Sequence, residues 1–370
     1  MGWQDELGRS VRTVEALAAH LPMDDAEKAR LGEIAERYPM AITLYYLSLI
    51  DPDDPDDPIR RMAVPSEAEA RLTGSFDTSG EMHNTVLDGL QHKYSQTGMM
   101  LSTNTCSMYC RHCFRKRLVG LSNDEVARQA DAVVAYVAAH AAINNVLVSG
   151  GDALLNSNAQ LEDLLGRLAT IEHLDFIRIG TRVPVVFPSR IVGDQALLDI
   201  LARVQAKKQL MLVTQFNHPR EITGQSAGAV RAVQALGIPV VNQAVLLRGV
   251  NDDAGVLGDL MRGLTGIGVL PYYVFQCRPV TGVKTHFQVP LREGIAIVQA
   301  AKAAQNGVGK SFRYCMSHVT GKLEILGMAG PEEMLFQYHE AVDSGNLGRL
   351  FTRPVATEQA WLDEPVLIDS

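Results

Sequence analysis

The sequence predicts an α/β protein, a partial (βα)6-type barrel with an N-terminal helical extension. From residue 99 onward, short apolar runs typical of buried strands alternate with amphipathic helical stretches. This alternation is typical of parallel strands joined by helices, whose functional loops follow the carboxyl ends of the strands. The expected strands are 99–101, 146–148, 176–179, 210–213, 240–245, 272–275 and 312–314.

Three segments divide the chain. Residues 1–98 are interpreted as N-terminal helices and a polar connecting arm, 99–330 as the barrel core, and 331–370 as a C-terminal helix and tail. Ser122 and Glu125 form a capping-box pattern that marks the first barrel helix. Further helices are expected over about 158–171, 194–206, 224–236, 252–265 and 290–305.

Composition narrows the class of function. The 370 residues are 46% hydrophobic and 21% charged, which is ordinary for a globular enzyme. A net charge of −8 predicts no general attraction to nucleic acid or to an anionic membrane surface. The chain has no apolar run long enough to span a membrane and no secretory signal pattern at its start, so we expect a cytoplasmic protein.

Cysteine usage points to metal or redox chemistry, because five cysteines, an odd number, argue against a disulfide framework. Cys106, Cys110 and Cys113 form a C-x3-C-x2-C pattern shortly after the first expected barrel strand. Three thiolates can ligate three irons of a [4Fe–4S] cluster and leave the fourth iron open. S-adenosylmethionine (SAM) can chelate that iron, and an electron from the cluster then releases a 5′-deoxyadenosyl radical that abstracts hydrogen.

Structural zinc is the alternative for this loop. Zinc requires four ligands, and the only nearby fourth candidate is His112, inside the loop. The spacing favours the cluster, and we count His112 among the residues of the cofactor site.

A glycine turn, Ser149-Gly150-Gly151-Asp152, directly follows the second expected strand. Two glycines at a strand end let a ligand approach the backbone, and freed peptide groups can hold its charged ends. A tight turn without a ligand is the simpler alternative.

The cysteine loop and its continuation, CSMYCRHCFRKRLVG, resemble lysine 2,3-aminomutase and related radical SAM enzymes. Matching segments recur in the same order, including VLVSGGDALL at 146–155, IRIGTRVPVVFPSRI at 177–191 and NQAVLLRGVND at 242–252. The resemblance implies a radical SAM barrel with a [4Fe–4S] cluster on the three cysteines. It also implies that the glycine turn binds SAM, and that Arg115 holds the substrate α-carboxylate through its bidentate fork.

Further expectations concern the SAM site and the partners. Arg182, after the third strand, and Gln243, in the fifth, are additional SAM-site candidates, and either can equally be an ordinary polar residue of the barrel interior. The expected partners are a small amino-acid-like substrate and an electron donor such as flavodoxin or ferredoxin. A homo-oligomer is compatible with the sequence.

The family also uses pyridoxal phosphate, held by a Schiff-base lysine and two phosphate-binding arginines. Lys322 aligns with that lysine, although the family's neighbouring glycine run is missing. Counting back from Cys106, the two arginine places hold Lys93 and Thr97, and only Lys93 carries a charge. Because one charged contact is lost, the sequence leaves open whether pyridoxal phosphate binds.

The substrate end departs from lysine 2,3-aminomutase as well. The two aspartates that hold the distal ammonium of lysine in that enzyme align with Arg278 and Cys315. An arginine repels an ammonium, so an acidic amino acid such as glutamate is a better candidate than free lysine. Alternatively, Arg278 turns outward or pairs with a protein carboxylate. His318 is a candidate for proton transfer or hydrogen bonding, or else structural; Cys277 and Cys315 are expected to be small buried hydrophobes.

Two enzymatic functions follow from the resemblance. The first is a 2,3-amino shift on an amino acid other than free lysine, with Lys322 carrying pyridoxal phosphate. The second keeps radical initiation without pyridoxal phosphate and leads to desaturation, elimination, epimerisation or another rearrangement. An iron–sulfur sensor or scaffold is a third interpretation, which the intact glycine turn opposes.

Overall fold

A computed structural model describes residues 2–121, 125–127 and 130–362 of the chain. Its strands form one sheet in sequence order, and the central strands pair in parallel. These parallel strands are β3 (Thr97–Thr103), β4 (Asn145–Gly150), β5 (Phe176–Gly180), β6 (Gln209–Thr214), β7 (Val240–Leu246), β8 (Leu270–Gln276) and β9 (Arg313–His318).

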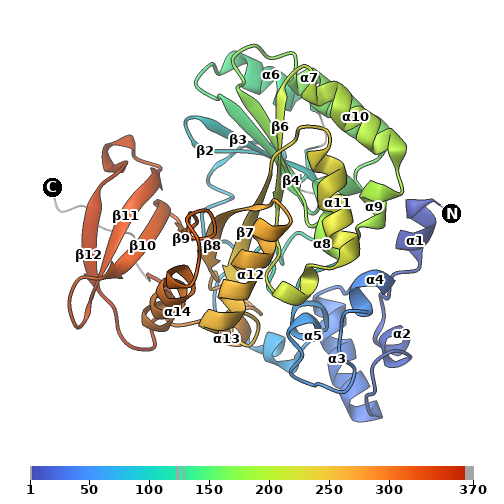
Figure 1. The fold of residues 1–370 in the computed structure, drawn as a ribbon, viewed down its shortest axis with the longest axis vertical. Coiled ribbons are helices and arrows are strands. Elements are labelled where there is room, and N and C mark those ends of the chain that lie inside the picture. The colour runs from blue at the N-terminus through green and yellow to red at the C-terminus, as the bar shows by residue number, and fades with distance from the viewer. Residues whose placement is uncertain (1, 122–124, 128–129, 363–370) are drawn as a thin grey trace.

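The parallel strands alternate with helices, which line one side of the curved sheet in Figure 1. The six main connecting helices complete the six βα units of the partial barrel that the sequence predicts. They are α6 (Ala130–Ala139), α7 (Asn158–Leu168), α10 (Gln195–Gln205), α11 (Gly224–Gln234), α12 (Ala254–Gly266) and α14 (Leu291–Ala303). Shorter helices are η2 (Ala153–Leu155), α8 (Val183–Val186), α9 (Ser189–Val192), η3 (Pro219–Glu221) and α13 (Lys284–Phe287).

Local sequence explains these helices. In α7, Ser157 and Gln160 form a capping box, and a leucine stripe that includes Leu161, Leu165 and Leu168 is buried on one face. Ser122 of the predicted capping box lies outside the described residues, whereas Glu125 is described and lies outside the helix, where it accepts from Arg117 at 2.9 and 2.6 Å. The helix α6 begins at Ala130.

Antiparallel strands extend both edges of the parallel sheet. β1 (Thr85–Leu87) and β2 (Leu90–Tyr94) precede β3, in the segment predicted to be only a connecting arm. At the other edge β10 (Gly321–Met328), β11 (Glu333–Ala341) and β12 (Leu350–Pro354) follow β9 and project from the barrel in Figure 1. A short helix, η4 (Ser344–Asn346), joins β11 to β12.

The predicted C-terminal helix within 331–370 is therefore wrong for the described part of that segment. Met334, Phe336 and Tyr338 are buried, whereas the residues between them are partly exposed. Burial at every second residue is the period of a strand, and it overrides the helical interpretation.

The N-terminal extension packs under the barrel, below α8 and α11 in Figure 1. Thr43 donates to the carbonyl of Val186 at 2.5 Å, and Tyr46 donates to Glu221 at 2.6 Å, so the extension reaches loops of the barrel. Within the described residues, no helix is long and apolar enough to cross a membrane. The helices of the N-terminal extension are α1 (Trp3–Gly8), α2 (Val14–Ala18), α3 (Asp25–Arg37), α4 (Leu44–Leu47), α5 (Pro58–Ala63) and η1 (Glu67–Ala70).

Candidate active site

The three clustered cysteines lie on the loop that follows the carboxyl end of β3, the first parallel strand. Cys106, Cys110 and Cys113 are free thiols with intermediate exposure. Burial raises the pKa of the Cys106 thiol, and nearby charges, including those of Cys113 and Cys110, act in the same direction. Cations bound to these thiolates would offset that repulsion.

The chemistry of this donor set fits an iron–sulfur cluster. In the described part of the chain, no three His, Cys, Asp or Glu side chains converge on a single metal-ion position. In a [4Fe–4S] cluster each thiolate binds a different iron, so convergence on one point is not required.

The cysteine loop is tied to the N-terminal extension by buried charges. Arg111 pairs with Glu69 at 2.6 Å, and Lys116 pairs with the same carboxylate at 2.6 Å. Arg111 also donates to the carbonyl of Tyr38 at 3.3 Å. Because all three charges are buried, they hold the loop in place.

His112 serves the loop's attachment to the barrel. Its Nε2 lies 3.0 Å from the amide nitrogen of Gln215 and 3.3 Å from that of Asn217, both in the loop after β6. Amide nitrogens donate, so Nε2 accepts and the imidazole is neutral. Burial and the charges of Arg182 and Lys116 hold the pKa of His112 well below its ordinary value.

The glycine turn after β4 packs directly against the cysteine loop. The Gly151 amide donates to the Thr103 carbonyl at 2.5 Å, and the Asp152 amide donates to the Thr105 carbonyl at 2.8 Å. A Cβ at Gly150, whose φ is +116°, would lie 2.3 Å from the Thr103 carbonyl oxygen, and one at Gly151 would lie 2.4 Å from that of Thr105. Both positions therefore require glycine.

The Asp152 side chain points into the protein. Its carboxylate accepts hydrogen bonds from Thr181 Oγ1 at 2.5 Å, Leu154 N at 3.1 Å and Arg182 N at 2.7 Å. Burial raises the pKa of this carboxyl. The aspartate expected at the SAM site thus links the ends of β4 and β5 in this structure.

Arg182 contacts the cysteine loop. Its Nη1 lies 2.8 Å from Cys110 Sγ, and its Nη2 donates to Glu221 at 2.5 Å. Tyr46 also donates to Glu221. Sequence reasoning did not identify Glu221 or Tyr46, because nothing near them in the sequence marks them as neighbours of the cysteine loop.

Arg115 lies between the glycine turn and the N-terminal arm. Its Nη2 and Nε donate to Glu81 at 3.0 and 3.2 Å, and its Nη1 lies 3.4 Å from Ser149 Oγ and from the Gly150 carbonyl. Arg117 binds the second oxygen of Glu81 at 2.9 Å. Burial alone would raise the pKa of Glu81, but the charges of Arg115, Arg278 and Arg117 lower it to about 2.

Arg278 joins this group from the end of β8. Its Nη1 donates to Ser79 Oγ at 2.8 Å, and its guanidinium lies 4.0 Å from the ring centroid of Phe114. Arg115 lies 4.6 Å from the same ring. Among the ion pairs of the described residues none involves Arg278. Burial lowers the pKa of Arg278, and the nearby Glu81 opposes that shift only in part.

Lys93 and His318 sit beside this arginine group. Lys93 Nζ donates to the carbonyls of Ser79 at 3.0 Å and His318 at 2.7 Å. Burial, Arg278 and Lys322 lower the pKa of Lys93 to about 8. The His318 ring contacts Thr320 at 2.9 Å, and burial lowers its pKa to about 4, so the imidazole is neutral near pH 7.

Lys322 enters the barrel from β10. Its Nζ lies 4.4 Å from the ring centroid of Tyr273 and 5.8 Å from that of Phe275. Burial lowers its pKa to about 8, and Arg178 and Arg278 act in the same direction. A lysine whose pKa is lowered toward neutral pH by burial and by neighbouring cations is suited to nucleophilic chemistry.

Arg178, on β5, is a partly buried cation that sequence reasoning did not single out. Its Nη2 donates to Asn145 at 2.5 Å, while its buried Nε has no hydrogen-bond partner among the described residues. Asn145 in turn donates to Thr97 Oγ1 at 3.1 Å. The Arg178 guanidinium is therefore linked through Asn145 to Thr97, the place at which the resemblance leads one to expect an arginine.

The remaining candidates lie in β7 and β9 and just after β8. Gln243 on β7 is partly exposed and is in register with Tyr273 of β8. Cys277 and Cys315 are free and buried, and burial raises the pKa of each thiol to about 12.

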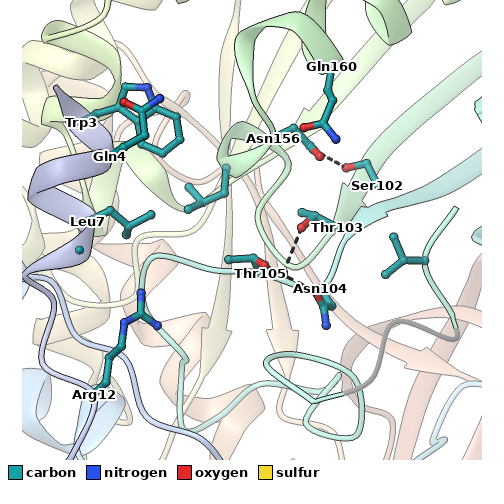
Figure 2. Close-up of a pocket in the computed structure, with 13 residues that line it drawn as sticks. Trp3, Gln4, Leu7, Arg12, Ser102, Thr103, Asn104, Thr105, Asn156 and Gln160 are labelled. Carbon is teal, nitrogen blue, oxygen red and sulfur yellow. Dashed lines mark hydrogen bonds between the residues drawn. The ribbon is translucent and has the colours of Figure 1, made fainter. Parts of the chain in front are cut away.

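A cavity of about 430 Å³ lies outside this group, between α1 and the end of β3. Figure 2 shows Trp3 and Leu7 of α1 opposite Thr103 and Thr105, which lead into the cysteine loop. None of the site residues predicted from the sequence lines it.

Comparison with known proteins places these features in a family. No family model matches the chain. L-lysine 2,3-aminomutase of Acetoanaerobium sticklandii is 39% identical over 367 residues, covering 98% of this chain and 84% of that protein. L-lysine 2,3-aminomutase of Clostridium subterminale is 36% identical over 359 residues, covering 95% and 83%. Glutamate 2,3-aminomutase of Clostridioides difficile is 34% identical over 308 residues, covering 83% and 71%.

Likeness to solved structures is remote. A radical SAM methyltransferase from Sphaerobacter thermophilus has a TM-score of 0.38 and 18% identity, covering 61% of this chain and 68% of that chain. At this TM-score the likeness says nothing about the substrate or the site residues.

Six βα units, three cysteines after the first parallel strand and a glycine turn after the second define the class, that of radical SAM enzymes. Within that class the chain belongs to the lysine 2,3-aminomutase family, because relatives at 39% and 36% identity cover nearly all of it. It is accordingly a radical SAM isomerase that uses a [4Fe–4S] cluster and SAM and acts on a small amino-acid substrate.

Proposed function

We propose that this chain is a 2,3-aminomutase whose substrate is an amino acid with an acidic side chain. Cys106, Cys110 and Cys113 hold the cluster, and the glycine turn at 149–152 holds SAM. When bound, the reduced cluster and SAM supply the 5′-deoxyadenosyl radical that removes hydrogen from the substrate. The observation that carries the substrate assignment is Arg278, a cation inside the site without a carboxylate partner in direct contact among the described residues.

Arg115 is the proposed partner of the substrate α-carboxylate. Glu81 accepts from the Nε and Nη2 of this arginine, so the bidentate fork that the resemblance implies for the substrate is taken by Glu81. Nη1 is left, directed at Ser149 and Gly150. A carboxylate bound at the Nη1 end would therefore lie beside the SAM turn. This geometry supports hydrogen abstraction close to the α-carbon, because reacting atoms need to be held within a few ångströms.

Arg278 is the proposed partner of the distal carboxylate. Ser79 and Phe114 fix its guanidinium, and Lys93 lies near enough to influence it electrostatically. An ammonium brought here would face arginine and lysine charges in a partly buried place, where like charges are poorly screened. A carboxylate would instead gain a charge-assisted hydrogen bond.

Lys322 and Arg178 support pyridoxal phosphate as the further cofactor. The unpartnered Nε of Arg178 can donate to a phosphate oxygen, and Lys322 has the lowered pKa that suits a Schiff base. When bound, pyridoxal phosphate stabilises the radical through which the amino group migrates. This arrangement favours an aminomutase over the alternative without pyridoxal phosphate.

The proposal also covers the electron donor, the cellular compartment and the assembly of the enzyme. A flavodoxin or ferredoxin would supply the electron, and the enzyme would work in the cytoplasm, with a homo-oligomer as its assembly.

The decisive experiment is substrate selection by the anaerobically reconstituted enzyme, with SAM and a reductant. Glutamate, aspartate and lysine are supplied with and without pyridoxal phosphate, and the β-amino acid product and 5′-deoxyadenosine are quantified. We expect turnover of an acidic substrate that depends on pyridoxal phosphate.

Arg278→Asp, which restores the family's acid, should shift the ratio of kcat/KM toward lysine by at least about tenfold, since charge reversal exceeds 1.4 kcal/mol. Arg248→Asp is the control, because Arg248 pairs with Glu293 at the surface. Equal use of lysine and acidic substrates by the wild-type enzyme, unchanged in the Arg278 variant, would refute the assignment.

A further inference from the structure

We propose that Arg182 sets the reduction potential of the [4Fe–4S] cluster through its hydrogen bond to the cysteine ligand Cys110. The inference goes beyond the proposed function, because it concerns how the cluster accepts its electron and is independent of the substrate. It differs from the SAM-binding role that the sequence suggested for Arg182.

Two of the three guanidinium nitrogens of Arg182 are held by hydrogen bonds to other protein groups, and the third contacts the sulfur. Its Nε donates to the Gln215 carbonyl at 3.0 Å, and its Nη2 donates to Glu221 at 2.5 Å. The remaining nitrogen, Nη1, lies 2.8 Å from Cys110 Sγ. Because the guanidinium is planar and rigid, two fixed edges determine where Nη1 points.

Glu221, the partner on the far side, is held just as firmly. One oxygen accepts from Tyr46 Oη at 2.6 Å, and the other accepts from the amides of Asn217 at 2.6 Å and His218 at 3.0 Å. Glu221 and Tyr46 are fully buried, and Arg182 is 8% exposed. Water therefore competes little with the hydrogen bonds that fix the guanidinium.

A hydrogen bond and a positive charge at a ligand sulfur stabilise the more negative, reduced form of a cluster. Arg182 contacts the sulfur directly, whereas Glu221 lies on the opposite edge of the guanidinium. The cation is therefore nearer to the cluster than its counter-ion, and the pair as a whole raises the reduction potential. Glu221 limits the size of that effect.

The same contacts argue against a primary role in SAM binding. A carboxylate ligand is held best by two parallel N–H groups of one guanidinium. In Arg182 the Nε and Nη2 edge is occupied by Gln215 and Glu221, and Nη1 already faces Cys110. Arg182 therefore has no pair of parallel N–H groups left to bind a SAM carboxylate.

The test is an anaerobic redox titration of the reconstituted enzyme in the absence of SAM, monitored by the electron paramagnetic resonance signal of the reduced cluster. For Arg182→Gln we expect a more negative midpoint, with about tenfold less reduced cluster at a fixed potential, which is 59 mV for one electron. For Glu221→Gln we expect a shift of the opposite sign. Tyr46→Phe keeps both charges and should stay near the wild-type midpoint.

Opposite shifts for the Arg182 and Glu221 variants would support the proposal. A wild-type midpoint for Arg182→Gln, accompanied by weaker SAM binding, would overturn it in favour of a SAM ligand. If Arg182→Gln does not retain its cluster, as judged by iron and sulfide content, Glu221→Gln decides: a midpoint that does not become more positive overturns the proposal. None of these readouts depends on the substrate, so they remain valid if the substrate assignment fails.

Discussion

Glu81 and Arg115 form a buried ion pair, with 3.0 Å between Glu81 Oε1 and Arg115 Nη2. The pair joins the N-terminal arm to the segment that follows the cluster cysteines. Asp77 shapes the arm here, because its carboxylate accepts from the amides of Glu81 at 2.7 Å and Met82 at 3.0 Å. A segment outside the barrel thus orients the proposed substrate arginine.

Loss of the Glu81 charge should weaken both folding and substrate binding. In Glu81→Gln, Arg115 and Arg117 lose their shared buried counter-ion, so we expect the free energy of unfolding to fall by about 3 kcal/mol. We also expect KM for the substrate to rise more than kcat falls, because Arg115 is misoriented. Urea unfolding of the apoprotein and steady-state kinetics measure the two effects, and Glu81→Asp should recover part of each.

The difference in the free energy of unfolding between wild type and Glu81→Gln should depend on pH in one direction. The pKa of Glu81 is about 2 in the folded protein, below its ordinary value of 4.5. The stabilisation from its charge is therefore complete above about pH 4.5 and is lost as the pH falls toward 2. The gap between wild type and Glu81→Gln should be constant from pH 8 to pH 6 and shrink below about pH 4.5; a gap that widens in acid would contradict the assignment.

Lys322 should carry pyridoxal phosphate covalently. Borohydride reduction of the loaded enzyme should leave a pyridoxyl group on this lysine, detectable by peptide mass spectrometry. Because its pKa is about 8, the rate of loading should rise as the pH increases through that value, where the amine becomes neutral.

Lys116 is a matched control within the same chain. Burial lowers its pKa to about 8 as well, but Glu69 holds it at 2.6 Å. It should stay unlabelled, and Lys322→Ala should abolish the label. Equal labelling of both lysines would show that the reaction reports only low pKa and not a cofactor site.

Arg178 should recognise the phosphate of that cofactor. Arg178→Gln removes the unpartnered buried Nε, and we expect affinity for pyridoxal phosphate to fall about tenfold to a hundredfold, the range of one charged hydrogen bond. Affinity for pyridoxal, which lacks the phosphate, should change little. Arg203→Gln is the control, because Arg203 pairs with Glu162 at the surface. An equal loss for both ligands would assign Arg178 to the barrel structure.

Those parts of the site that are contiguous in the sequence could be predicted, whereas contacts between distant segments could not. The cysteine loop and the glycine turn are contiguous motifs, and the alternation of strands and helices predicted the loops that carry them. Ser79 and Glu81 could not be predicted, because they lie in a polar arm and meet Arg278 and Arg115 only after folding.

One expectation failed for a physical reason, and the structure adds a contact set to another. The C-terminal segment alternates buried and partly exposed residues, and this strand period was not recognised. Asp152 belongs to a motif associated with SAM, yet its carboxylate accepts three hydrogen bonds from the protein. A motif identifies the turn, but only tertiary contacts show what each side chain does.

The contact between the glycine turn and the cysteine loop yields the last prediction. Gly151→Ala places a Cβ 2.4 Å from the Thr105 carbonyl oxygen, next to Cys106, and the loop must shift to accept it. We expect this variant to retain less cluster after reconstitution and to bind SAM more weakly.

Gly166→Ala is the matched control, because it lies in the helix α7, where nothing beyond the neighbouring backbone of that helix lies within 4 Å of the added Cβ. Alanine there should be neutral or stabilise by up to about 1 kcal/mol, the difference in helix propensity. Iron content, SAM affinity and thermal unfolding, compared between the two variants, separate a local effect on the loop from a general effect of replacing glycine. Wild-type cluster content in Gly151→Ala would mean that the turn and the loop move independently, against the close contact seen between them.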